Sequence, residues 1–104
     1  MPNRGVENEL RMQHRLLAIL RILERLPGGT SNSYLLNDLL LPYALSGSAE
    51  EMREDLSQLN EIGAIALTVF GALHVAMLTD RGVTLSQGRE WSDLIKRPLA
   101  DCPY

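Results

Sequence analysis

Apolar residues recur at helical spacing near the start of the chain. From Glu9 to Leu26 they return every three or four positions, so they line one side of a helix. The run Pro27-Gly28-Gly29 ends this pattern, because Pro and Gly interrupt helices. We therefore expect a first helix of residues 9–26, with a buried stripe that comprises Met12, Leu16, Ile19, Leu20, Leu23 and Leu26.

Two more helical patterns follow, each with a recognisable end. Residues 30–33 are polar candidates for the cap of a second helix, which should end before Leu41-Pro42. Ser48 and Glu51 have the spacing of a capping box, and Gly63 suits the left-handed position after a helix. The third helix should bury Met52, Leu56, Leu59 and Ile62.

After Gly63 the pattern changes from helical to extended. Residues 64–69 and 73–78 are short apolar segments that predict two strands, with a turn at Phe70-Gly71. Thr79 is a candidate cap for a last helix that runs to about Trp91. Gly82 in its first turn would let this helix approach the hairpin closely.

This order of elements predicts an α+β, mainly α fold of the winged helix-turn-helix type. The second and third helices form the helix-turn-helix, and the hairpin is the wing. We expect a flexible N-terminus over residues 1–8, a winged-helix domain over residues 9–92 and an extended C-terminal tail over residues 93–104.

Composition and charge bear on the number of domains, the cellular compartment and the binding partner. A chain of 104 residues forms one domain, and its single cysteine, Cys102, excludes an internal disulfide. We expect a cytoplasmic protein, because no signal peptide or membrane-spanning segment is visible. The formal net charge is −3, whereas nucleic-acid-binding domains tend to be basic. Binding to DNA would therefore require a locally basic surface.

Several short runs resemble a family of small winged-helix proteins, described as ArsR-like, from Mu-like transposable phages and prophages. These runs are 15–28, 53–63, Leu78-Thr79-Asp80-Arg81-Gly82, Gly88-Arg89 and Ile95-Lys96-Arg97-Pro98, within residues 10–98. The resemblance implies a winged-helix fold, a phage or prophage origin and a bacterial host cytoplasm. It also implies a DNA-binding transcriptional regulator.

The third helix would be the recognition helix of such a regulator. Its exposed side, however, combines one cation with five carboxylates: Arg53 with Glu50, Glu51, Glu54, Asp55 and Glu61. Each phosphate contact requires a cation, so this helix is poorly charged for DNA. Our DNA-contact candidates are Arg53, Ser57, Gln58, Asn60, Arg89, Lys96 and Arg97. The polar side chains among them could instead only solvate the helix.

The first helix carries two further candidate surfaces. Arg11, Arg15, Arg21 and Arg25 form a basic face beside His14. This face could bind phosphate or an acidic partner, or it could be a solvated face on which Arg21 pairs with Glu24.

The candidate interface of a homodimer comprises Leu10, Leu17 and Trp91. The alternative is that the C-terminal segment folds back and covers this apolar strip.

The inventory of reactive residues does not indicate an enzyme. His14, His74 and Cys102 lack metal-ligand spacing, and no glycine-rich phosphate loop is present, so we expect no metal and no cofactor. Two functions remain. The one that we predict is a dimeric winged-helix regulator that binds double-stranded DNA, because two copies can assemble a basic surface that one chain does not show. The alternative is a winged-helix module that binds a protein partner through its acidic third helix and does not bind DNA.

Overall fold

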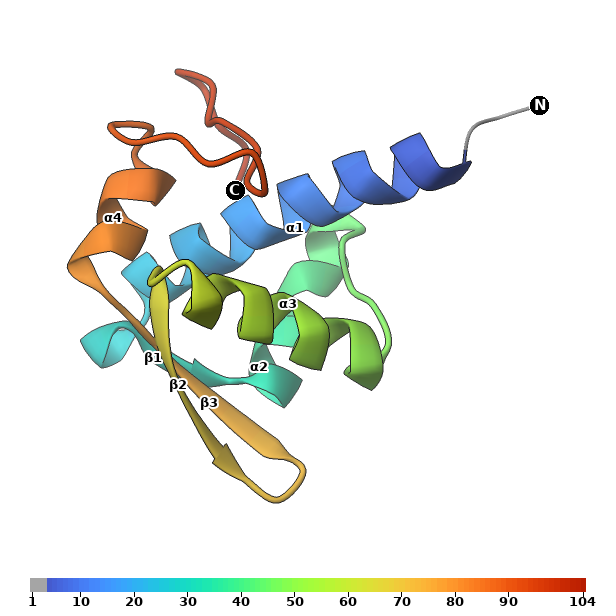
Figure 1. Ribbon diagram of the computed structural model, residues 1–104, viewed down its shortest axis with the longest axis vertical. Coiled ribbons are helices and arrows are strands. Elements are labelled where there is room, and N and C mark those ends of the chain that lie inside the picture. The colour runs from blue at the N-terminus through green and yellow to red at the C-terminus, as the bar shows by residue number, and fades with distance from the viewer. Residues whose placement is uncertain (1–3) are drawn as a thin grey trace.

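The computed structural model describes residues 4–104, which form four α-helices and a three-stranded antiparallel sheet (Figure 1). The elements are α1 (Arg4–Arg25), β1 (Thr30–Asn32), α2 (Ser33–Leu40), α3 (Ala49–Glu61), β2 (Ile65–Phe70), β3 (Leu73–Leu78) and α4 (Asp80–Ser86). Short 3-10 turns follow α1 and α2. The expected mainly helical α+β fold is confirmed at this level, and the arrangement is compatible with a winged helix.

The first helix is longer than its apolar pattern predicts. It begins at Arg4, whereas the pattern places its start at Glu9, so residues 4–8 are helical and do not form a lead-in. The apolar pattern does not extend into this first part of the helix. Residues 5–11 are exposed, so no buried face requires apolar side chains at helical spacing there. The remainder of the predicted N-terminal segment, residues 1–3, lies outside the described residues.

The helical core is confirmed. Leu16, Ile19, Leu20 and Leu23 of α1 are completely buried, together with leucines from α2 and α3. Burial of such a side chain contributes roughly 1.5–3 kcal/mol. Met12 and Leu26, at the two ends of the predicted stripe, are half-buried. The three helices therefore hold one another through a shared apolar interior.

Both predicted ends of α3 are confirmed. The Ser48 hydroxyl accepts the Glu51 amide at 3.0 Å, and the Glu51 carboxylate accepts the Ser48 amide at 2.9 Å. At the other end Gly63 has a φ of 80°, and the amide of Ala64 donates to the carbonyl of Leu59 at 2.9 Å. These local bonds fix where α3 starts and where the chain leaves it.

The sheet has the order β1-β3-β2. Phe70 pairs with Leu73, so the turn consists of Gly71 and Ala72, one position later than predicted. Gly71 has a φ of 58°, as the first position of a type II′ turn requires. The strand β1 is not predicted by the sequence. Its three residues are too few to show alternation, and its last residue, Asn32, also caps α2.

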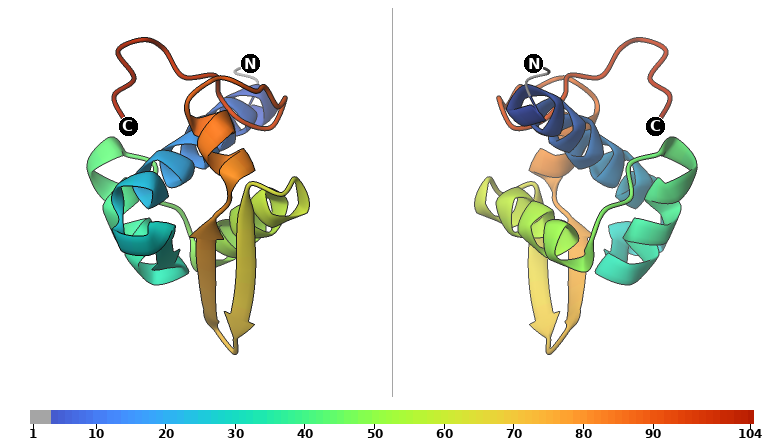
Figure 2. Two further views of the ribbon diagram at one scale, coloured as in Figure 1. Left: turned by 90° about the vertical axis from the view of Figure 1, so that its left-hand side faces the viewer. Right: turned by 90° about the vertical axis from the view of Figure 1, so that its right-hand side faces the viewer.

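The last helix is shorter than expected. It ends at Ser86 and does not continue to Trp91, because Gly88 adopts a φ of 75°. The amide of Arg89 donates to the carbonyl of Thr84 at 3.0 Å, which completes the C-terminal cap. The chain then returns along α1, at the end of the molecule opposite to the β2–β3 hairpin (Figure 2).

Candidate functional site

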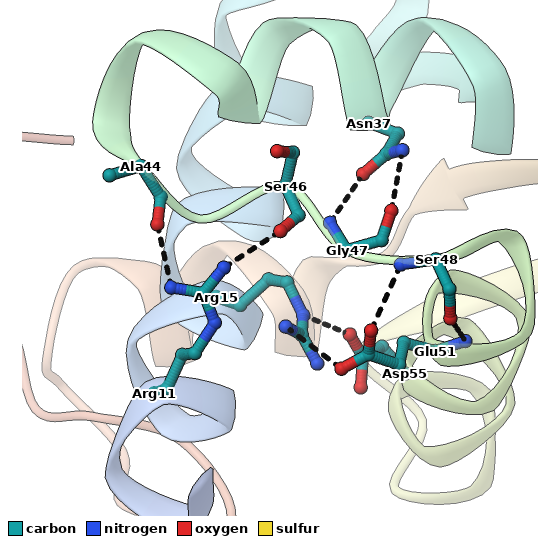
Figure 3. A network of polar contacts seen from close by, with 9 residues as sticks. All are labelled: Arg11, Arg15, Asn37, Ala44, Ser46, Gly47, Ser48, Glu51 and Asp55. Atoms are coloured by element: carbon teal, nitrogen blue, oxygen red, sulfur yellow. Dashed lines mark hydrogen bonds and ion pairs between the residues drawn. The ribbon is translucent and has the colours of Figure 1, made fainter. Parts of the chain in front are cut away.

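The predicted basic face of the first helix is engaged within the chain. Arg11 donates to the carbonyl of Ala44 and to that of Ser46, both at 2.7 Å (Figure 3). These carbonyls belong to the connection between α2 and α3. Hydrogen bonds from a charged donor are stronger than neutral ones, so Arg11 ties this connection to α1.

Arg15 is buried against α3. Its side chain is 4% exposed, and its Nε donates to the carboxylate of Asp55, which is 2% exposed. The second carboxylate nearby, that of Glu51, lies 3.8 Å from the guanidinium. Burial raises the pKa of Asp55, although Arg15 opposes the change. The exposed positions predicted for Arg15 and Asp55 are therefore wrong, because the two charges pair inside the α1–α3 contact.

Arg21 holds the C-terminal part of the chain. It donates to the carbonyl of Tyr104 at 2.9 Å and to that of Ser86 at 3.0 Å. Glu24, its expected partner, instead accepts hydrogen bonds from the hydroxyl of Ser86 and from the side-chain amide of Gln87, each at 2.8 Å. The alternative of local Arg21–Glu24 pairing is thus wrong, since both side chains bind the end of α4.

The remaining polar groups of this face join the same contacts. Arg25 donates to the hydroxyl of Tyr43 at 3.3 Å, and Nδ1 of His14 lies 2.7 Å from the hydroxyl of Tyr104. Burial, and then the charge of Lys96, lower the pKa of His14. We call Arg11, Arg15, Arg21 and Arg25 the α1 arginines. All of them cross-link the fold, so this face offers no free cluster of cations.

The exposed side of α3 is acidic in the folded chain. Glu50, Glu54 and Glu61 are exposed, and within residues 5–104 none of them forms an ion pair. Their spacing places them along one face of the helix. We call these three residues the glutamate stripe. Arg53 lies beside the stripe and is also exposed.

The side chains of α3 that we predicted to contact DNA bases differ in their exposure and in their hydrogen bonds. Ser57 is exposed, whereas Gln58 is half-buried. The side-chain oxygen of Asn60 accepts the amide of Leu67 at 3.1 Å and so anchors β2 to α3. Among residues 5–104, Arg53 and Ser57 are the two candidates of this helix that are exposed and form no hydrogen bond or ion pair.

The other predicted DNA contacts lie elsewhere. Arg89 donates to the side chain of Gln87, and the guanidinium of Arg97 stacks 3.8 Å from the ring centre of Trp91. Lys96 is half-buried beside α1. The C-terminal segment and the hairpin occupy opposite ends of the molecule, so a single chain does not combine these cations with Arg53 (Figures 1 and 2).

The dimer candidates of the first helix are also separated. Leu17 is 1% exposed and lies beneath the C-terminal segment, next to Leu99 and Tyr104. Leu10 and Trp91 are exposed. The alternative in which the C-terminal segment covers the strip therefore holds for Leu17.

Arg53 borders a cavity of about 140 Å³ between α2, α3 and the hairpin turn, lined also by Tyr34, Asp38 and Ala72. Among residues 5–104, Arg53 is the only arginine without a hydrogen bond, ion pair or ring contact. Its guanidinium is thus the one in this part of the chain that no other group of the fold binds.

The β2–β3 hairpin contrasts with α3 in its chemistry. Residues 62–79 contain no Asp, Glu, Lys or Arg. Four large apolar side chains of the hairpin are exposed: Val69, Phe70, Leu73 and Met77. His74 is half-buried. The hairpin therefore presents an apolar, uncharged surface.

Two structural contacts were not predicted from the sequence. Asn37 exchanges two hydrogen bonds of 2.9 Å with the backbone of Gly47, and Arg81 donates to the carbonyl of Ile62 at 2.8 Å. Arg81 belongs to one of the runs that carry the family resemblance, and that run was the feature of the sequence that could have indicated a structural role for it. Asn37 had no such feature, because its partner is a backbone group distant in sequence.

No family model, curated protein or solved structure matches this chain. The resemblance to phage proteins thus stays a prediction. Within residues 4–104, no helix is both long and apolar enough to cross a membrane, and no group of three or more His, Cys, Asp or Glu residues could hold a metal ion.

Proposed function

We propose that this chain is a winged-helix module that binds a basic protein partner through the glutamate stripe of α3. The proposal follows the predicted alternative, with α3 in the place of the recognition helix and the β2–β3 hairpin in the place of the wing. The arrangement of three helices before an antiparallel hairpin supports this assignment.

One observation carries the proposal, namely the uneven distribution of charge on α3. Among residues 5–104, Glu50, Glu54 and Glu61 form no ion pair, while each of the α1 arginines donates to another group of the same chain. A DNA duplex would bring phosphates toward these carboxylates, with Arg53 as the only cation of the helix. A partner with lysine or arginine side chains would instead meet complementary charge.

Fluorescence polarisation with a labelled decalysine peptide tests the proposal at low salt. We expect the wild-type chain to bind this probe, and we expect the variant Glu50→Gln/Glu54→Gln/Glu61→Gln to bind it about tenfold more weakly. The matched control is Glu9→Gln/Asp93→Asn/Asp101→Asn, which removes the same charge from other exposed positions. Equal loss of affinity in both variants would show general electrostatic attraction and would contradict a role for the stripe.

Binding to double-stranded DNA is the second candidate, favoured by the free guanidinium of Arg53 next to the hairpin turn. The same assay with a random-sequence duplex separates the candidates, because non-specific DNA affinity is largely electrostatic and strongest at low salt. If the duplex binds, if Arg53→Ala weakens it, and if the decalysine does not bind, the regulator function replaces the docking function.

A further inference from the structure

The strand β2 lies at the edge of the sheet, since it pairs with β3 alone. In an antiparallel pair with a two-residue turn, alternate residues direct their backbone groups away from the partner strand. Phe70 closes the turn with Leu73, so Leu67 and Val69 direct theirs outward. The bond from the Leu67 amide to Asn60 confirms this alternation. Among the residues that the structure describes, no such cap is found for the outward amide of Val69.

This edge lacks the usual protection against another strand. Proteins commonly shield edges with lysine, proline, bulges or a covering element. Between Ile65 and Leu78 there is no charged residue and no proline, and the pairing continues without a bulge to Phe70. Helix α3 reaches the edge at Leu67 through Asn60, which leaves the end of β2 near the turn open.

The outer face of the hairpin adds apolar area next to this edge. Phe70 is 63% exposed and lies opposite Leu73, and Met77 is 49% exposed and lies opposite Ala66. Cross-strand neighbours share one face of a sheet. A strand added beside β2 would therefore extend an apolar face as well as satisfy backbone groups.

We propose that a second copy of this chain occupies the edge, with β2 pairing antiparallel to β2 of the partner around Val69. Such pairing is self-complementary, as a two-fold interface requires. The chain has a net charge of −3, and the hairpin is a surface on which two copies meet without opposing like charges. A polyanion or a basic protein finds no counter-charge there. The inference is independent of the glutamate stripe.

Sedimentation equilibrium of the full chain tests this pairing. We expect a reversible dimer that Val69→Lys weakens at least about tenfold, because a charge is placed at the edge. Leu41→Lys is the matched control, since Leu41 is an exposed leucine away from the hairpin and 65% exposed. A wild-type chain that stays monomeric, or a dimer equally sensitive to both variants, would overturn the proposal.

Two further measurements make the result independent of how well Val69→Lys folds. In a Cys102→Ser background, Val69→Cys should form an intermolecular disulfide on oxidation and Leu41→Cys should not. Added salt should tighten the dimer, because it screens repulsion between two acidic chains, whereas it should weaken decalysine binding. Failure of cross-linking at Val69 contradicts the β2 pairing even if the glutamate stripe binds its basic probe.

Discussion

The α1 side of the molecule and the β2–β3 hairpin use polar chemistry in opposite ways. On the α1 side, four arginines hold α3, the α2–α3 connection and the C-terminal segment in place. The hairpin contains no Asp, Glu, Lys or Arg and exposes Phe70 and Val69. The sequence suggests that the arginines of α1 bind a partner, but in the structure they bind groups of the same chain. The hairpin, which has no charged residue, keeps its apolar side chains exposed.

The difference shows that charge in a sequence does not reveal its use. An arginine on a helix face can bind phosphate, or it can bind carbonyls of its own chain, and the spacing along the helix is the same for both. The uncharged hairpin does not have this ambiguity, and its exposed apolar side chains and open edge are the basis of the β2 pairing proposed above.

The largest expected effect is the loss of the buried ion pair. Arg15→Ala leaves Asp55 buried without its cation, so we expect a decrease of about 3–5 kcal/mol in the free energy of unfolding, measured with urea. Arg53→Ala, at an exposed and unpaired arginine, should change it by less than about 0.5 kcal/mol. A similar small change for Arg15→Ala would mean that the α1 side is not held by this pair.

The junction between the hairpin and α4 should give the next largest effect. A Cβ at Gly82 would lie 2.2 Å from the carbonyl oxygen of Ala64, so Gly82→Ala must push α4 away from the hairpin. We expect a loss of about 2–3 kcal/mol in urea unfolding. For comparison, Gly71→Ala meets no atom within 4 Å but keeps a φ of 58°, and should cost about 1 kcal/mol. The reverse order would show that the junction yields more easily than the turn.

The smallest expected effect is a pH dependence confined to the α1 side. The pKa of His14 is lowered from 6.5, so the folded state favours its neutral form. The stability that this provides is present above the unfolded pKa and is lost as the pH falls through 6.5 toward the folded pKa. Urea unfolding between about pH 5.5 and 7.5 should therefore show a shallower slope for His14→Gln than for the wild type. An unchanged slope would assign the dependence to another group.

Much of the fold was predictable because it depends on neighbours in sequence. The capping box of Ser48 and Glu51, the left-handed Gly63 and the cap at Thr79 all form between residues a few positions apart. Such motifs can be recognised from the sequence alone, because all of their residues lie close together along the chain. The end of α4 was misplaced although Gly88 was visible, because a glycine within a polar run does not by itself show which residue adopts a positive φ.

The candidate site was harder to predict, because its residues depend on distant partners. Asp55 belongs to the polar side of a helical pattern, and only its contact with Arg15, forty positions away in the chain, buries it. Leu17 is covered by the C-terminal segment. The outer side of β3 is covered by β1, a strand too short to show alternation, so β2 is the strand of the hairpin that lies at the edge.

The sequence by itself therefore determined the order of the four helices and the hairpin, the caps at Ser48 and Thr79 and the apolar core, because period and capping are local properties of the chain. The tertiary structure alone decided which charges remain available. It placed the α1 arginines against carbonyls and a carboxylate of the same chain, and it left the glutamate stripe and the edge at Val69 exposed. The physical reason is that a charged side chain can be satisfied by any group that the fold brings within hydrogen-bonding distance.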